Sequence, residues 1–305
     1  MVTRDLWGNF FEDDADSVVV VGDNTSTQEW AKRQGHRFLH ISQGLEQKPE
    51  RCVLVGTTKY WYSKLSMLRY EFAASAVMWL PLGAFDGSEP SVAYGLRQLE
   101  LVDWSQTANA QSEATARLTS RRVLMRDRFG RVADATIPAG TPVHEARLDI
   151  VKTGEFRSLV GSLEVETEYM SFDGPPLDCN GQLEIDCILF ALSPRTLMTD
   201  SERSIASCLS REVSSGPALL TMNGARVESF KIGNREALPA LVDLAGNELQ
   251  DRITEVSIGL NEDLIDADWS FNSPMNEGAA GVHFGVGDGY SGVHIDFVSA
   301  AARVS

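Results

Sequence analysis

The sequence is poor in cysteine, and the few cysteines it has are not arranged for metal binding. Four cysteines occur among 305 residues, and no two of them stand in a C-x-x-C arrangement. Structural zinc sites commonly pair their thiolates at that spacing, so the pattern argues against such a site. Reduced, buried thiols are expected, and a Cys179–Cys187 disulfide stays open as the alternative.

Positive charge and long apolar runs are also scarce. The formal net charge is -16, and a surface of that sign repels nucleic-acid phosphates and anionic membranes, so neither is an expected partner. The first residues carry charge throughout, and the longest apolar runs, 18–21 and 73–82, are far too short to span a bilayer. The sequence therefore predicts a cytoplasmic protein that tolerates cations and basic peptides.

Common catalytic and nucleotide-binding motifs are missing as well. The glycines at 285–289 are not followed by a helical pattern, and Gly56-Thr57-Thr58-Lys59 lacks the first glycine of a phosphate-binding loop. Motifs that carry a serine or cysteine nucleophile are absent. The chemistry of the chain, if it has any, must come from another kind of site.

What is present in the first part of the chain is an alternation of strand-like and helix-like segments. Short β-branched runs predict strands at 17–22, 37–41, 52–56 and 77–82, and apolar spacing predicts helices at 28–34, 60–76, 90–102 and 105–126. Such alternation is typical of an α/β lobe with a largely parallel sheet.

The pattern changes near residue 128, where the chain becomes rich in strands. Strands are predicted at 144–151, 158–171, 182–192, 253–259, 281–286 and 293–298, with helices at 200–213 and 237–250. Asn223-Gly224 predicts a hairpin over 219–228. We therefore expect two lobes, an α/β lobe over 1–128 and a strand-rich α+β lobe over 129–305 that carries the metal or peptide site.

Two of the five histidines lie close together near the end of the chain. In V-H-I-D-F-V, His294 and Asp296 share one face of a strand because side chains alternate between faces. His283 lies on the preceding strand, so pairing through the glycine loop would let the three side chains converge. Two imidazoles and a carboxylate suit Zn²⁺, Co²⁺, Mn²⁺ or Fe²⁺. The other interpretation, a simple hydrogen bond between His294 and Asp296 on a solvent-facing strand, stays open.

A carboxylate also stands in the strand-like segment T-E-V-S-I-G. The alternation places Glu255 and Ser257 on the face opposite Thr254, Val256 and Ile258. In so apolar a strand, Glu255 is either an edge residue or a metal ligand.

These segments resemble the M29 (thermophilic) aminopeptidase family and its relative, 2,5-dihydroxypyridine dioxygenase. The resemblance rests on T-E-V-S-I-G-L-N at 254–261, N-E-G-A-A-G-V-H-F-G-V-G-D at 276–288 and G-V-H-I-D-F-V at 292–298. It implies an M29 aminopeptidase-like fold. It also implies a ligand set and an active-site tyrosine, namely Glu255, His283, His294, Asp296 and, as the catalytic residue, Tyr290. For a dioxygenase, the iron ligands would be the two histidines and Asp296.

The chain departs from the peptidases at one further ligand. Their upstream glutamate, in a G-E motif, has no counterpart in the corresponding segment 173–178, and the chain is shorter than is usual for the family. A second resemblance follows from these departures. Short proteins of this fold occur in the crocagin pathway, which builds a modified ribosomal peptide, and there they resemble peptide-binding proteins.

The resemblances imply three functions, and all three stay open. Whether the chain is an enzyme also stays open. The first is a peptide-binding protein that acts on or presents a precursor or leader peptide, with a retained or vestigial metal site holding one divalent metal or none. The second is an active metal-dependent aminopeptidase, and the third is an Fe²⁺ ring-cleaving dioxygenase. Pathway enzymes and a second copy of the chain, as in a homodimer, are the other implied partners.

Overall fold

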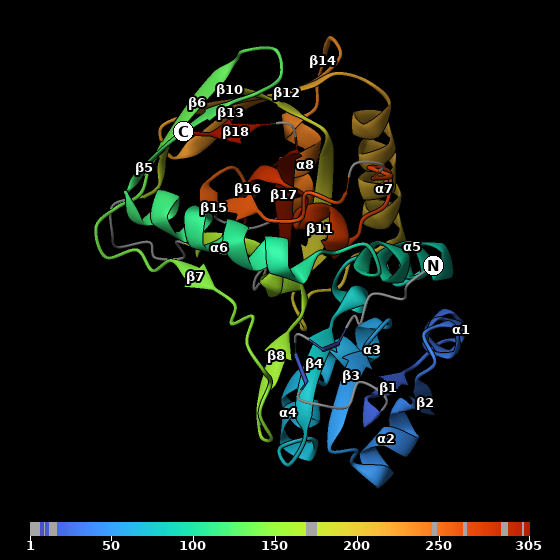
Figure 1. Cartoon of the computed structure of the whole chain (residues 1–305). Helices are drawn as coiled ribbons and strands as arrows, with labels where there is room; N and C mark the ends of the chain where they lie inside the picture. Colours follow the sequence, from blue (N-terminus) through green and yellow to red (C-terminus); the bar gives the residue numbers. More distant parts are fainter. Residues whose placement is uncertain are drawn as a thin grey trace.

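The computed structural model describes residues 7–8, 10–11, 17–168, 176–245, 249–264, 267–287, 292–300 and 302–305. Within these residues the chain forms one five-stranded parallel sheet and two antiparallel sheets of seven and six strands. The parallel sheet and its helices form one end of the molecule, and the antiparallel sheets form the other (Figure 1). The predicted mixed α/β class, with a parallel sheet in the first part, is confirmed.

The parallel sheet has the strand order β2-β1-β3-β4-β8. Its strands are β1 (Val19–Gly22), β2 (Arg37–His40), β3 (Arg51–Val55), β4 (Ala76–Leu80) and β8 (Phe156–Ser158). The helices of this region are α1 (Thr25–Arg33), α2 (Ile41–Gln47), α3 (Lys59–Ser63), α4 (Leu65–Glu71), the 3₁₀ helix η2 (Leu82–Ala84) and α5 (Glu89–Leu99). β1 and β4 are buried along their whole length, as expected of a parallel sheet covered on both faces.

Two predicted helices of the first part differ from the structure. The segment 60–76 forms two short helices that meet at Lys64, where the Ser63 hydroxyl donates to the Tyr60 carbonyl and so competes with helical bonding. The segment 105–126 forms α6 (Trp104–Thr119) followed by a strand, β5 (Arg122–Arg126). Arg121 lies between them with φ +67, a left-handed conformation that ends the helix.

The seven-stranded sheet has the order β14-β13-β12-β10-β6-β5-β18. Its further strands are β6 (Val132–Thr136), β10 (Asp178–Ile185), β12 (Ala218–Asn223), β13 (Arg226–Ile232), β14 (Arg235–Glu236) and β18 (Arg303–Val304). The hairpin predicted at Asn223-Gly224 joins β12 to β13, with Gly224 at φ +64. The helices α7 (Asp200–Ser215) and α8 (Leu238–Ala245) belong to the same end of the molecule.

The six-stranded sheet carries the segments that the sequence marked as functional. Its order is β11-β17-β16-β15-β9-β7, and its strands are β7 (His144–Glu145), β9 (Glu164–Glu168), β11 (Cys187–Leu192), β15 (Ile253–Gly259), β16 (Gly281–Val286) and β17 (Val293–Ser299). One face contributes Val256, Phe284 and Ile295 to the largest apolar core. The opposite face carries the polar residues described below.

The predicted strand 182–192 is two strands in two different sheets. β10 ends at Ile185 and β11 begins at Cys187, so the chain passes between the antiparallel sheets at Asp186. The Asp186 amide donates to the Val298 carbonyl at 2.8 Å, and its carboxylate accepts from the Ala300 amide at 2.9 Å. The strand-like pattern of 182–192 runs through Asp186, so the local sequence gives no signal of such a crossing.

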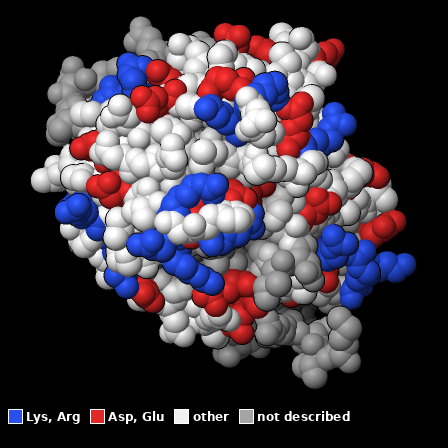
Figure 2. Space-filling model, turned by 90° about the horizontal axis from the view of Figure 1, so that it is seen from above, with Lys and Arg blue, Asp and Glu red and all other residues white. Residues whose placement is uncertain are grey.

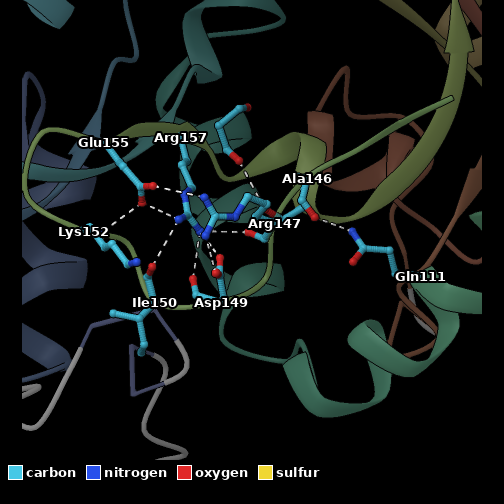
Figure 3. A network of polar contacts seen from close by, with 10 residues as sticks. Gln111, Ala146, Arg147, Asp149, Ile150, Lys152, Glu155 and Arg157 are labelled. Carbon is cyan, nitrogen blue, oxygen red and sulfur yellow. Dashed lines mark hydrogen bonds and ion pairs between the residues drawn. The ribbon is translucent and has the colours of Figure 1, made fainter. Parts of the chain in front are cut away.

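The segment between β7 and β9 joins the two ends of the molecule. β7 pairs with β9 in the six-stranded sheet, whereas β8 pairs with β4 in the parallel sheet, and the short 3₁₀ helix η3 (Val160–Ser162) follows. Figure 3 shows Arg157 at the centre of this segment, where its guanidinium donates to the Asp149 carboxylate at 2.7 Å and also contacts Glu155. These contacts hold the connection that leads into β9.

The same segment corrects two predicted strands. The strand predicted at 144–151 is reduced to the two residues of β7, and the one predicted at 158–171 is divided among β8, η3 and β9, with 169–171 outside the described residues. Because β8 belongs to the parallel sheet, that sheet takes one strand from beyond residue 128. The division of the chain into lobes over 1–128 and 129–305 stays a prediction.

Helix length and surface charge describe the exterior of the molecule. Within the described part of the chain, no helix combines the length and the apolar character that a membrane span requires. On the face seen in Figure 2, basic and acidic side chains are interspersed, so the net negative charge does not form a continuous acidic field there.

Candidate metal centre

The polar face of the six-stranded sheet brings together side chains from four strands. The cross-strand register places Glu255 of β15 opposite Gly285 of β16, and Gly285 opposite Asp296 of β17. His283 lies opposite Ser257, one row along the sheet. Directly paired residues of antiparallel strands point to the same face, so these side chains share one surface of the sheet.

Glu255 lies between the two histidines. Its Oε1 atom is 2.9 Å from His283 Nε2, and its Oε2 atom is 3.2 Å from His294 Nε2. His294 Nε2 also lies 2.9 Å from Asp296 Oδ1. The four ligands expected from the sequence are therefore neighbours in space, and Glu255 is a buried residue of a central strand rather than an edge residue.

Two further glutamates, which were not predicted as ligands from the sequence, reach the same place. Glu164 of β9 places its Oε2 atom 3.4 Å from His283 Nε2, and Glu277 comes from the short helix α9 (Pro274–Glu277). Both lie outside the segment 173–178, in which the sequence offers no counterpart of the peptidases' upstream glutamate. The signals were the alternating acids of E-V-E-T-E at 164–168 and an acid six residues before His283.

The catalytic residue implied by the resemblance cannot be placed in the same way. Tyr290 lies outside the described residues, as do its neighbours in the loop between β16 and β17. Its role stays a prediction.

The six side chains form three overlapping groups whose ligand atoms lie within 4.8 Å of one another. These groups are Glu164–Glu255–His283, Glu255–His294–Asp296 and Glu277–His283–Asp296. Among them, the two histidines fall into different groups, and Glu255 belongs to a group with each histidine. A carboxylate shared in this way has the arrangement of a bridging ligand between two metal ions.

The spacing of the donor atoms fits a metal ion. Four contacts between ring nitrogens and carboxylate oxygens in this cluster span 2.9 to 3.4 Å. Nitrogen and oxygen ligands placed about 2.0–2.1 Å from a tetrahedral Zn²⁺ would be separated from one another by about 3.3 Å. The donors are therefore already gathered at distances close to those between ligands of one ion.

Several buried polar atoms in this cluster have no hydrogen-bond partner. Asp296 and His283 are both 0% exposed. Asp296 Oδ1 contacts only His294, and neither Asp296 Oδ2 nor His283 Nδ1 has a hydrogen-bond partner within the described residues. Leaving a buried carboxylate without hydrogen bonds costs several kcal/mol in order of magnitude, whereas a bound cation satisfies it. A cation ligated by Asp296 Oδ2 would satisfy this oxygen.

The electrostatics of the cluster also favour a cation. Burial raises the pKa of Glu164 to about 7 and places that of Glu277 well above its ordinary value. Burial alone would lower the pKa of His283, but its hydrogen bond to Glu255 and the surrounding carboxylates outweigh burial and raise the pKa to about 9. Burial likewise opposes ionisation of Glu255, but hydrogen bonds to His283 and His294 hold its pKa below the usual range. Protons therefore fill the place that a metal ion would take.

A hydrogen-bonded loop holds α9 against the site. The Tyr94 hydroxyl of α5 donates to Asn276 Oδ1 at 2.5 Å and accepts from the Asp268 amide at 3.2 Å. The Asn276 side-chain amide in turn donates to the carbonyls of Asp268 and Phe271. Glu277 follows directly in sequence, so these buried contacts set where its carboxylate enters the cluster.

A family model describes nearly the whole chain. Residues 15–305 match the model of the crocagin biosynthetic protein CgnE/B, so the chain belongs to this family. The family gives it a role in the biosynthesis of a ribosomally made, modified peptide, as the sequence resemblance implied.

Other comparisons add little to this assignment. A solved structure of 2,5-dihydroxypyridine dioxygenase from Pseudomonas putida KT2440 aligns with 96% of this chain and 89% of that chain, at 11% sequence identity and a TM-score of 0.46. No curated protein matches the sequence. The resemblance to M29 aminopeptidases stays a prediction.

Proposed function

We propose that this member of the crocagin biosynthetic family binds the precursor peptide of the pathway next to a divalent metal centre. Glu255, His283, His294 and Asp296 hold the metal, together with Glu164 and Glu277. The observation that carries the metal centre is the position of Glu255, whose two oxygens face one histidine each. Beside it lies the buried Asp296 carboxylate, whose Oδ1 contacts His294 and whose Oδ2 has no partner among the described residues. A metal bound there would act as a Lewis acid on a carbonyl group.

Three features support a peptide as the bound molecule. The family builds a natural product from a ribosomal peptide, so a peptide is the substrate that any pathway protein meets first. The chain carries a net charge of -16, which favours a basic segment of such a peptide. The His294 side chain is 13% exposed, so a ligand would reach the metal from the side of this ring.

Metal analysis of the purified protein tests the metal centre. We expect at least one equivalent of a divalent metal after incubation with Zn²⁺, Co²⁺, Mn²⁺ or Fe²⁺, and its loss in His294→Ala. His144→Ala is the matched control, because His144 is exposed on β7 and belongs to none of the three groups. Equal metal content in wild type and His294→Ala would sink the proposal.

Isothermal titration with a synthetic precursor peptide tests the peptide half of the proposal. We expect the zinc-loaded wild-type protein to bind the peptide. If charge attraction contributes, the affinity should decrease when the salt concentration is raised to about 0.3 M. Absence of binding at peptide concentrations of about 1 mM, the weak end of specific affinities, contradicts it.

A second function, that of a metal-dependent aminopeptidase, is favoured by one observation. Glu255 belongs to two ligand groups, which is the arrangement that two-metal hydrolases use to hold both ions. Hydrolysis of amino-acid arylamides with added Co²⁺ or Zn²⁺ distinguishes this function from binding alone. Hydrolysis that disappears in Glu255→Gln supports the peptidase, and bound metal without hydrolysis supports the binding protein.

A further inference from the structure

At one edge of the six-stranded sheet, a single side chain caps Phe190 of the strand β11. β11 is the last strand in the sheet order, so one side of its backbone has no neighbouring strand among the described residues. There the Phe190 amide donates to Asn272 Oδ1 at 2.8 Å, and Asn272 Nδ2 donates to the Phe190 carbonyl at 3.0 Å. A primary amide that accepts from one residue's N–H and donates to its C=O reproduces the two hydrogen bonds that a neighbouring strand would make.

The side chain of Asn272 is not the only group that holds its loop in place. Its backbone carbonyl accepts from the Asp86 amide at 3.2 Å, which ties the loop to the segment after β4 independently of the side chain. Asn272 is only half-buried, so rotation of its side chain exposes the Phe190 amide and carbonyl. Toward the other end of β11, the Ser210 hydroxyl donates to the Ile188 carbonyl at 3.4 Å, so α7 covers that part of the edge.

A pocket lies beside the capped part of the edge. Its volume is about 270 Å³, and it lies among the loop that follows β4, the edge strand β11 and the helix α7. The apolar side chains that line it are those of Phe85, Phe190, Leu192, Met198 and Ala206. Asn272 and Ser207 line it as well. A strand added to β11 would direct alternate side chains toward this pocket, because side chains alternate along a strand.

We propose that an extended segment of the precursor peptide adds to β11 by replacing the Asn272 side chain at Phe190, with an apolar side chain in the adjoining pocket. This inference rests on the proposed peptide-binding function and gives it a location. Main-chain hydrogen bonds supply affinity in such strand addition, and the pocket supplies selectivity for an apolar residue.

The proposed strand would lie near the metal centre but not over it. β11 pairs with β17 in a register that places Leu189 opposite Asp296 and Ala191 opposite His294. Neighbouring strands are about 4.8 Å apart, so a strand added outside β11 lies about 10 Å from β17. The segment bound there is therefore an anchor, and a different part of the peptide would reach the metal.

Hydrogen exchange at Phe190 tests the proposal directly. In Asn272→Ala the Phe190 amide loses its partner, so we expect its exchange in the zinc-loaded protein to accelerate by about tenfold or more. Addition of the synthetic precursor peptide is expected to restore slow exchange in this variant. Asn109→Ala, an exposed substitution on α6, is the matched control and leaves exchange at Phe190 unchanged.

A second pair of variants tests the pocket. Ser207→Trp places a large ring at the mouth of the pocket from the exposed side of α7, and we expect peptide affinity to fall at least tenfold, or ~1.4 kcal/mol. Ser215→Trp makes the same change on the last turn of that helix, outside the pocket, and leaves affinity unchanged.

The outcomes separate this inference from the function on which it rests. If wild type binds the peptide but Phe190 stays unprotected in Asn272→Ala with peptide present, or Ser207→Trp binds normally, the strand-addition site is wrong and peptide binding stands. If wild type binds no peptide, both fail. Protection of Phe190 in Asn272→Ala that depends on protein concentration without peptide would identify a second copy as the occupant and overturn the proposal.

Discussion

The imidazole of His294 lies directly over the backbone of Gly285. A Cβ atom built on Gly285 would come within 2.4 Å of His294 Nε2 and within 2.8 Å of the Glu255 Cβ atom. Gly285 is opposite both Glu255 and Asp296 in the cross-strand register. The missing side chain at this position therefore makes the space in which the ring of His294 meets the two carboxylates.

Gly285→Ala should consequently damage the metal centre without removing a ligand. The added methyl group pushes the His294 ring away from Glu255, and we expect zinc affinity to fall by roughly ten- to a hundredfold, as when groups that support metal ligands are changed. Overpacking is also expected to lower the free energy of unfolding by about 1–3 kcal/mol. Titration calorimetry and thermal unfolding measure the two effects.

Gly161→Ala is the matched control for this substitution. A Cβ atom on Gly161 meets no atom within 4 Å, and both zinc affinity and the unfolding temperature are expected to stay at wild-type values. Wild-type zinc affinity in Gly285→Ala would contradict a role for His294 as a ligand.

Glu277→Gln removes the ionisable group of Glu277 but keeps the shape of its side chain. Glu277 is one of the two glutamates that were not predicted as ligands from the sequence. Burial raises the pKa of Glu277 well above its ordinary value and so favours the neutral carboxyl in the metal-free protein. The isosteric amide should then leave the unfolding temperature of the metal-free protein nearly unchanged while zinc affinity falls at least tenfold, about 1.4 kcal/mol.

Glu228→Gln provides the comparison, since Glu228 is exposed on β13 and belongs to none of the ligand groups. Metal content and thermal unfolding of both variants are the measurements. A large fall in the stability of metal-free Glu277→Gln would show that Glu277 is ionised there, in conflict with this account.

Tyr94→Phe tests the support of α9. Removing the hydroxyl leaves Asn276 Oδ1 and the Asp268 amide without this partner, so we expect a loss of about 1–3 kcal/mol in the free energy of unfolding. Because Asn276 precedes Glu277, zinc affinity should also decrease, but less than in Glu277→Gln. Tyr60→Phe, at a 61% exposed tyrosine, should change neither quantity, and unchanged zinc affinity in Tyr94→Phe would show that α9 does not depend on this contact.

The stability of the metal-free protein should fall as pH rises from about 5 to about 9. Glu164 has its pKa raised from 4.5 to about 7, and His283 has its pKa raised from 6.5 to about 9. Across this window the native state keeps protons that the unfolded chain has released, so stability decreases with pH. The lowered pKa of Glu255 acts in the opposite direction, but only below about pH 4.5.

Bound metal should reverse this dependence, because it replaces the protons on the same groups. Unfolding temperatures measured across the pH range, with chelator and with saturating Zn²⁺, provide the test, and calorimetry in buffers of different ionisation enthalpy counts the protons released. A metal-free protein that becomes more stable between pH 5 and pH 9 would contradict the protonation described for this cluster.

The local sequence determined most of the bounds of the strands that carry the predicted ligands. The strands predicted at 253–259 and 281–286 coincide with β15 and β16, and the one predicted at 293–298 ends one residue short of β17. The two-residue alternation of strand side chains depends only on neighbouring residues. The sequence alone therefore placed His294 and Asp296 on the same face of their strand, and Glu255 and Ser257 on the same face of theirs.

Tertiary structure decided which other residues complete the cluster. Glu164 enters because β9 pairs with β15 across about ninety residues of sequence, and Glu277 enters because Tyr94 holds α9 over the sheet. It also decided that β5 is a strand and that the chain changes sheets at Asp186. Pairing and packing of this kind are contacts between distant segments, and the periodicity of either segment by itself does not specify its partner.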